Sequence, residues 1–101
     1  MTLHYGIRGA PFPLEDAQRC VGPGWAGLVA ECYEMLPDGS TLEQVKEKYG
    51  GLRFYATPDV PGIAEVEERS LTVCEDCGAH GIPREGGWIR TMCDHCAAAR
   101  P

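Results

Sequence analysis

The sequence predicts an α+β fold in which one small domain, residues 1–101, combines an amphipathic helix, a β-hairpin and a C-terminal four-cysteine zinc ribbon. Three observations carry this prediction. Apolar residues recur at helical spacing from residue 25 to 36, an aromatic-rich run follows a Gly-Gly pair, and two Cys-x-x-Cys pairs lie within residues 73–96. A chain of this length buries only a small core, which a structural metal commonly supplements.

The N-terminal third predicts an irregular or edge-strand segment followed by two helices. Residues 1–12 show no periodicity, and Pro13 suits the first turn of a short helix with Glu15 and Asp16 near its positive end. A second helix is predicted because five apolar side chains share one helical face: Trp25, Leu28, Val29, Cys32 and Leu36. Core packing is the expected role of the tryptophan and the cysteine in this set.

The stretch TLEQVKEKYGGLRFYA, residues 41–56, fits two structures. A capping box from Ser40 to Glu43 and apolar residues at helical spacing favour a helix over residues 41–49. Alternating polarity and a two-residue turn at Gly50-Gly51 favour a hairpin instead. The hairpin is preferred, because the aromatic run LRFY is expected to be a strand and needs a partner.

The segment before the cysteines predicts a short helix over residues 63–71, from the apolar spacing of Ile63, Val66 and Leu71. It leads into Val73 without a flexible linker. Residues 73–96 are therefore expected to form a zinc-binding segment that is integrated into the domain.

Four of the six cysteines form two Cys-x-x-Cys pairs with fifteen residues between them. This spacing is typical of a zinc site with four sulfur ligands, here Cys74, Cys77, Cys93 and Cys96, and predicts one bound Zn²⁺. His80 and His95 are alternative ligands, since either could replace a thiolate. A site with four protein ligands leaves no position open for water, so the zinc is predicted to be structural.

No catalytic constellation accompanies the cysteines. The sequence offers no Ser-His-Asp set, no Cys-His pair and no paired carboxylates that can be placed together, and the adjacent Asp94 and His95 lie inside the metal loop. The protein is therefore predicted not to be an enzyme.

The charge balance argues against nonspecific nucleic-acid binding. Fifteen acidic and nine basic residues give a formal charge of −6, and four thiolates with one zinc ion add −4 + 2 = −2, making −8. No apolar run is long enough to span a bilayer, and the start MTLHYGIRGAPFP lacks signal-peptide features. We therefore expect no membrane partner and a cytoplasmic location, where thiols stay reduced.

One basic and aromatic cluster stands out in this acidic chain. A candidate binding surface comprises Lys46, Lys48, Tyr49, Arg53 and Tyr55, together with Trp88 and Arg90 of the zinc segment. The competing interpretation places Tyr49, Leu52 and Phe54 in the core, with the lysines protecting a sheet edge, and also buries Trp88. This second interpretation is preferred.

Four motifs occur here in the same order as in a family of small proteins associated with bacteriophages, prophages and bacterial genomes. They are GW before the amphipathic helix, QVKEKYGGLRFY, CEDCG and GWIRTMCDHC, and the resemblance covers roughly residues 24–96. Members are described as zinc-finger-like, and their often alternating, β-branched counterpart of TLEQVKEK supports the hairpin. Where the family often ends its motif in histidine, this chain has Cys96. The resemblance implies no activity.

Together these features predict a zinc-stabilised small binding protein that acts through protein–protein interaction. A phage-derived inhibitor of a host defence or nucleic-acid-handling complex is one specific form of this prediction. The alternative is a nucleic-acid-binding zinc ribbon, which the charge balance disfavours.

Overall fold

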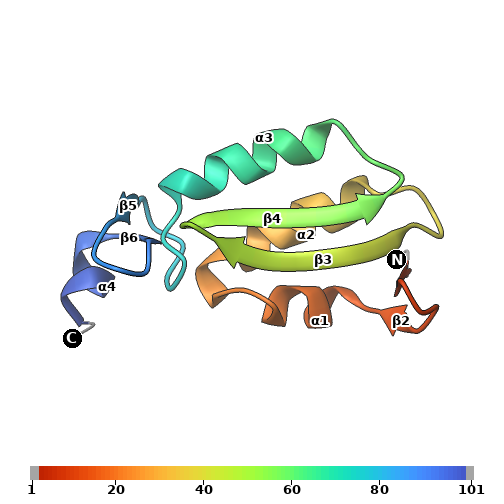
Figure 1. The fold of residues 1–101 in the computed structure, drawn as a ribbon, viewed down its shortest axis with the longest axis horizontal. Coiled ribbons are helices and arrows are strands. Elements are labelled where there is room, and N and C mark those ends of the chain that lie inside the picture. Colours follow the sequence, from red (N-terminus) through yellow and green to blue (C-terminus); the bar gives the residue numbers. More distant parts are fainter. Residues whose placement is uncertain (1–2, 100–101) are drawn as a thin grey trace.

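The computed structural model describes residues 3–99, so residues 1, 2, 100 and 101 of the predicted domain lie outside the described part. A four-stranded sheet with three helices forms one end, and a two-stranded ribbon with a short helix forms the other (Figure 1). The elements are β1 (His4–Gly6), β2 (Pro11–Phe12), α1 (Leu14–Arg19), the 3₁₀ turn η1 (Pro23–Trp25), α2 (Ala26–Met35), β3 (Thr41–Lys48), β4 (Gly51–Thr57), α3 (Gly62–Arg69), the 3₁₀ turn η2 (Ser70–Thr72), β5 (Ile82–Arg84), β6 (Arg90–Met92) and α4 (Asp94–Ala99). The α+β prediction is confirmed.

The N-terminal strand lies inside the sheet, so the expectation of an irregular or edge segment is wrong for β1. The strand order is β2-β1-β3-β4, with β1 parallel to β3 and the other neighbours antiparallel. Buried His4 holds β1 in place: its main-chain N–H donates to the Tyr33 hydroxyl and its Nε2 lies 3.2 Å from the Tyr33 carbonyl oxygen. A contact so distant in sequence leaves no periodic signal in residues 1–12.

The predicted hairpin is confirmed as β3 and β4, which excludes the helix over residues 41–49. The predicted turn is shifted by one residue: Lys48 pairs with Gly51, and Tyr49 and Gly50 form the turn with φ of 54° and 80°. A two-residue turn with positive φ at both positions matches the twist of the flanking strands. The register places Val45 opposite Phe54 on the buried side of the sheet.

A β-bulge explains why β3 resembles a helix in sequence. Leu42 pairs with Ala56 and Gln44 with Tyr55, so Glu43 is an extra residue in the strand. The extra residue lets both Leu42 and Val45 face the core although they are three positions apart. A helical spacing in the sequence therefore arises here from an irregular strand.

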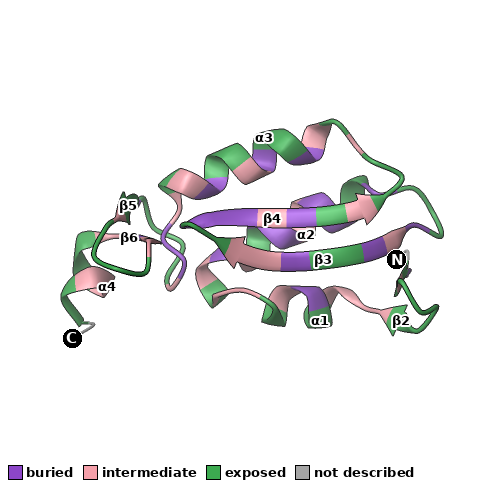
Figure 2. Cartoon of the chain, in the orientation of Figure 1, coloured by how far each residue is buried: buried purple, intermediate pink, exposed green. Residues whose placement is uncertain are grey.

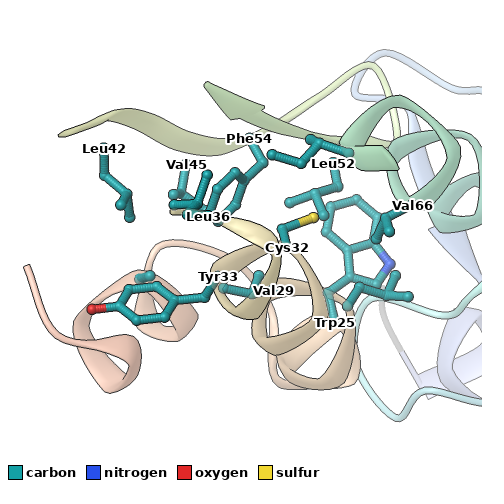
Figure 3. Close-up of a cluster of buried hydrophobic side chains, with 13 residues drawn as sticks. Trp25, Val29, Cys32, Tyr33, Leu36, Leu42, Val45, Leu52, Phe54 and Val66 are labelled. Carbon is teal, nitrogen blue, oxygen red and sulfur yellow. The ribbon is translucent and has the colours of Figure 1, made fainter. Parts of the chain in front are cut away.

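The core lies between the hairpin and α2, as the close-up in Figure 3 shows. The predicted helical face is confirmed: α2 buries Leu28, Val29 and Cys32, with Trp25 just before the helix and Leu36 just after it. Burial, with smaller contributions from Glu67 and Glu31, raises the pKa of the Cys32 thiol to about 12. Cys32 is thus a neutral core side chain.

Cys32→Ala is expected to lower the free energy of unfolding by roughly 1 kcal/mol through lost packing, and to leave the metal content unchanged. Thermal melting and elemental analysis measure the two quantities. Cys20→Ala is the control, because Cys20 is exposed and its loss should change neither. Loss of metal from the Cys32 variant would show that the ligand set proposed below is wrong.

The second face of the hairpin is uncovered. In Figure 1, α2 lies behind the hairpin with α3 above and α1 below, and no described element crosses in front. Lys46, Arg53 and Tyr55 belong to this open face, because successive residues of a strand point to opposite sides and their neighbours Val45 and Phe54 are buried. Figure 2 shows buried stretches interspersed with more exposed ones along both strands.

Candidate metal centre

The fold brings together the sulfur atoms of Cys74, Cys77, Cys93 and Cys96. All four lie within 4.8 Å of one another, and the Cys77 and Cys93 Sγ atoms are 3.7 Å apart. Four sulfurs arranged tetrahedrally about 2.3 Å from one ion are about 3.8 Å apart, so the set can hold one metal ion after a small contraction. Within residues 3–99, His80 and His95 are not part of this group.

The first pair sits in a tight turn closed by main-chain hydrogen bonds. The N–H of Cys74 donates to the Ala79 carbonyl at 2.7 Å, and the N–H of Gly78 donates to the Cys74 carbonyl at 3.0 Å. Gly78 has a φ of +84°, which a residue with a side chain rarely adopts. The glycine after the second cysteine therefore lets the chain fold back around both sulfurs.

The second pair spans the junction between β6 and α4. Cys93 follows β6 directly, and Cys96 lies in the first turn of α4. The N–H of Cys96 points at the Cys93 sulfur at 3.4 Å, and the N–H of Ala97 donates to the Cys93 carbonyl. This turn places both sulfurs on the side of the ribbon that faces Cys74.

Main-chain amides and neighbouring sulfurs set the acidity of the thiols. Burial opposes ionisation of Cys74, but N–H groups of Cys93, Cys77 and Asp76 outweigh it and lower its pKa to about 6. The sulfurs of Cys93 and Cys77 raise the pKa of Cys96 to about 12. One thiol ionises readily whereas Cys96 resists, chiefly because it shares hydrogen bonds with the sulfurs of Cys93 and Cys77. A bound cation would favour the ionised form of all four thiols.

The segment just before Trp25 packs closely against the first cysteine turn. The N–H of Gly24 donates to the Glu75 carbonyl at 2.7 Å, and the Trp25 Nε1 donates to the Val73 carbonyl at 2.8 Å. A Cβ atom on Gly24 would lie 2.0 Å from the Cys74 carbonyl oxygen. The sequence signals this close backbone contact only through the run Gly22-Pro23-Gly24.

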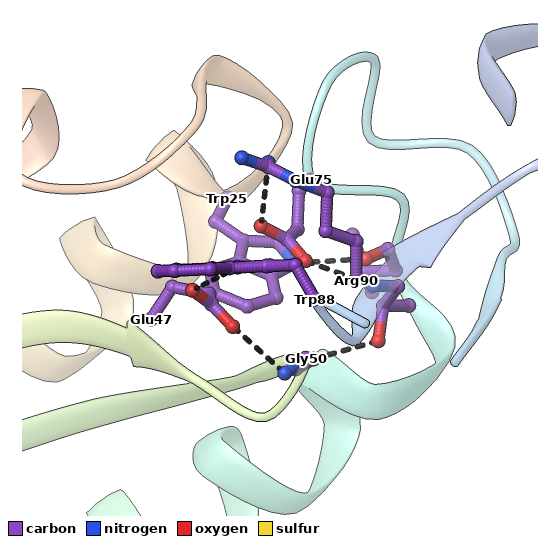
Figure 4. A network of polar contacts seen from close by, with 8 residues as sticks. Trp25, Glu47, Gly50, Glu75, Trp88 and Arg90 are labelled. Carbon is purple, nitrogen blue, oxygen red and sulfur yellow. Dashed lines mark hydrogen bonds and ion pairs between the residues drawn. The ribbon is translucent and has the colours of Figure 1, made fainter. Parts of the chain in front are cut away.

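A second contact joins the ribbon to the hairpin turn (Figure 4). The hydroxyl of buried Thr91 donates to the Gly50 carbonyl at 2.6 Å. The N–H of Thr91 donates to Glu75 Oε2 at 2.8 Å, and Arg90 lies 3.8 Å from the same carboxyl. Burial raises the pKa of the Glu75 carboxyl. Glu75 and Thr91 carry no recognisable sequence signal, because their importance depends on contacts distant in the chain.

The predicted binding surface is only partly brought together. Lys46, Arg53 and Tyr55 share the open face, whereas Arg90 turns toward the buried Glu75 and its side chain is 38% exposed. The preferred core interpretation holds for Leu52 and Phe54, which are buried.

That interpretation is wrong for two aromatic residues. Tyr49 is 68% exposed and Trp88 is 70% exposed. Tyr49 is displayed because it occupies the hairpin turn itself, and Trp88 because it precedes β6 in the loop between the ribbon strands.

These two aromatic residues border one cleft of about 250 Å³ between the hairpin turn and the ribbon loop. Glu47 lies in its wall and accepts hydrogen bonds from the N–H of Gly50 at 2.8 Å and from the Trp88 Nε1 at 3.2 Å. Lys48 completes the rim, with its ammonium 5.6 Å from the centre of the Tyr49 ring. The cleft combines exposed aromatic surface with the Glu47 carboxylate, whose two oxygens already accept hydrogen bonds from within the chain.

Comparisons with protein-family models, with curated proteins and with solved structures found no match for this chain. None of the helices formed by residues 3–99 has the length and apolar character that crossing a membrane requires.

Proposed function

We propose that this chain is a zinc-stabilised binding protein that acts by docking to another protein and catalyses no reaction. Four clustered sulfurs suit a metal ion that accepts thiolate ligands in tetrahedral coordination, and Zn²⁺ is the ion that such closed sites commonly hold. Four protein ligands leave no position for a water or a substrate. A reducing bacterial cytoplasm, where thiols remain available to the metal, is the proposed setting.

The observation that carries the binding role is the exposed pair Tyr49 and Trp88 around one cleft. Tryptophan and tyrosine dominate the binding energy of protein interfaces, because they bury large areas with few rotatable bonds. Isolated exposed apolar residues are ordinary, but two large aromatic side chains bordering one hollow form a docking site.

The fold fixes both side chains, and for Tyr49 it does so at a cost. Tyr49 adopts a φ of 54°, a position in hairpin turns that asparagine or glycine fills more cheaply. Trp88 is oriented by its hydrogen bond to Glu47. Neither feature improves the core, so both are explained by a partner that covers the cleft. Inhibition of a host complex is one form that such docking would take.

Photo-crosslinking in a native lysate tests the proposal by comparing wild type with Tyr49→Asn/Trp88→Ser. Asparagine fits the turn and serine fits an exposed loop, so the variant should keep its fold while losing both rings. The matched control is Ile7→Ser, because Ile7 is 72% exposed and belongs to the loop between β1 and β2.

We expect a crosslinked protein in the wild-type and Ile7→Ser samples that is at least about tenfold weaker in the double variant, as for loss of interface anchors. Nuclease treatment should not change it. Crosslinks that are the same in all three proteins would contradict the docking role of the cleft.

A further inference from the structure

The basic residues of the described chain fall into two groups. Arg19, Arg69, Arg84 and Arg90 each form an ion pair with a carboxylate. Lys46, Lys48, Arg53 and Arg8 form none within residues 3–99. Arg8 lies in the loop between β1 and β2, whereas the other three belong to the hairpin. In a chain of net charge −6, three cations without acidic partners are concentrated beside the Tyr49 end of the sheet.

Two of these cations directly oppose each other. Lys46 and Arg53 are register partners on β3 and β4, on the open face of the sheet. Like charges in this position destabilise a sheet, whereas a glutamate at either position would stabilise it. The fold therefore retains an unfavourable pair that an anion lying across the two strands would relieve.

Lys48 connects this pair to the aromatic cleft. It lies two residues from Lys46 on the same strand, and it also lines the cleft, where its ammonium faces the Tyr49 ring. The cations and the aromatic pair thus form one continuous surface around the hairpin turn.

We propose that this surface takes an acidic peptide segment of the partner protein, with carboxylates on Lys46, Lys48 and Arg53 and one apolar side chain in the cleft. The inference deepens the proposed function, on which it rests, by specifying the chemistry of the partner. Opposite charge at the rim selects the partner and speeds its encounter, while the buried anchor supplies affinity.

The dimensions of the patch favour a peptide over a single-stranded nucleic acid. Alternate residues on a strand are about 6.7 Å apart and neighbouring strands about 4.8 Å, so the three cations cover a footprint of about 7 by 5 Å. That area accommodates two or three carboxylates, whereas a single-stranded nucleic acid occupies about 4–16 nucleotides on an OB fold that binds it. The exposed carboxylates of Glu43 on β3 and Glu85 between β5 and β6 also disfavour a long polyanion.

Selection of binders from a random displayed peptide library tests the proposal on the metal-loaded protein, in parallel with Lys46→Glu/Arg53→Glu. Wild type should enrich sequences that place Asp or Glu beside a leucine or an aromatic residue. The selected peptides should bind the double variant at least about tenfold more weakly, as should copies with Gln in place of Asp and Glu. Enrichment of neutral or basic peptides would overturn the proposal.

The single variant Lys46→Glu separates binding from folding. It replaces the like-charge pair with an attractive Glu–Arg pair, so its Tm should rise by about 2–4 °C while its affinity for the selected peptides falls. The double variant restores a like-charge pair and should melt close to wild type. Weaker binding in a more stable protein cannot result from misfolding, and unchanged binding by Lys46→Glu contradicts the role of this face.

A final measurement tests nucleic-acid binding: fluorescence anisotropy of labelled oligothymidylate and oligouridylate over a range of salt concentrations. Weak binding that does not depend on Lys46 and Arg53 is expected. Binding tighter than that of the peptides, lost in the double variant and weakening steeply with salt, would assign the face to nucleic acid. If lysate crosslinks depend on Trp88 but not on Lys46 and Arg53, protein docking stands and the acidic specificity fails.

Discussion

Cys74→Ser is expected to leave the protein without metal and largely unfolded at room temperature. Zinc bound to finger peptides contributes roughly 10–16 kcal/mol of apparent binding free energy, which exceeds the total stability of many small domains. The damage should extend beyond the ribbon, because the first cysteine turn contacts Gly24 and Trp25, and Thr91 bonds to the hairpin turn. Circular dichroism and a zinc assay measure fold and metal together.

Cys20→Ser is the matched control for this variant, because Cys20 is exposed and lies outside the sulfur cluster. It should keep both its metal and its melting temperature. A Cys74→Ser protein with one equivalent of zinc and an unchanged melting curve would show that Cys74 is not an essential ligand.

Gly24→Ala is expected to cost about 3 kcal/mol or more, which is large for an added methyl group. The new Cβ would lie 2.0 Å from the Cys74 carbonyl oxygen and 2.6 Å from the Gly78 nitrogen. Both atoms belong to the backbone of the metal turn, so no side chain can move aside and the turn itself must shift. Zinc affinity should therefore fall together with the melting temperature.

Gly27→Ala is a control that should raise stability rather than lower it, because a Cβ at Gly27 meets nothing within 4 Å. This glycine lies in α2, where alanine should add about 0.5–1 kcal/mol of stability through helix propensity. Differential scanning calorimetry of both variants measures the contrast. Equal effects of the two substitutions would contradict close contact between the Gly-Pro-Gly segment and the metal turn.

The cysteine cluster could be predicted from the sequence because its signal is local. Two thiolates separated by two residues and followed by glycine form the same tight turn in many proteins, and a second pair completes a tetrahedral set. The α2 face was predictable for a similar reason, since helical periodicity needs only neighbouring positions. In both cases the nearby residues determine the geometry.

The hairpin was predictable in type but not in detail. The bulge at Glu43 and the positive φ of Tyr49 shift the pattern, and both depend on which register buries Val45 against Phe54. Sequence alone places glycines at the turn, whereas the core decides that a tyrosine occupies one of its two positions.

The contacts that unite the two ends of the molecule could not be predicted. Thr91 with Gly50, Glu75 with Gly24, and Trp88 with Glu47 join residues 41 to 51 positions apart in the chain. Such contacts follow from the position of the metal turn against the core. The exposure of Trp88 has the same origin, because this arrangement leaves the ribbon loop beside the hairpin turn rather than over the core.

Zinc titration of wild-type protein from which a chelator has removed the metal tests most directly whether a metal stabilises this fold. Near-ultraviolet circular dichroism reports on the surroundings of the buried Trp25, whose indole N–H donates a hydrogen bond to the carbonyl of Val73, the residue before Cys74. Thermal melting reports on the whole domain. We expect a non-native apoprotein that recovers its native signal and its melting transition together, with a sharp endpoint at about one equivalent of zinc. An apoprotein that keeps the native spectrum and melting temperature, with zinc added or withheld, would contradict the account.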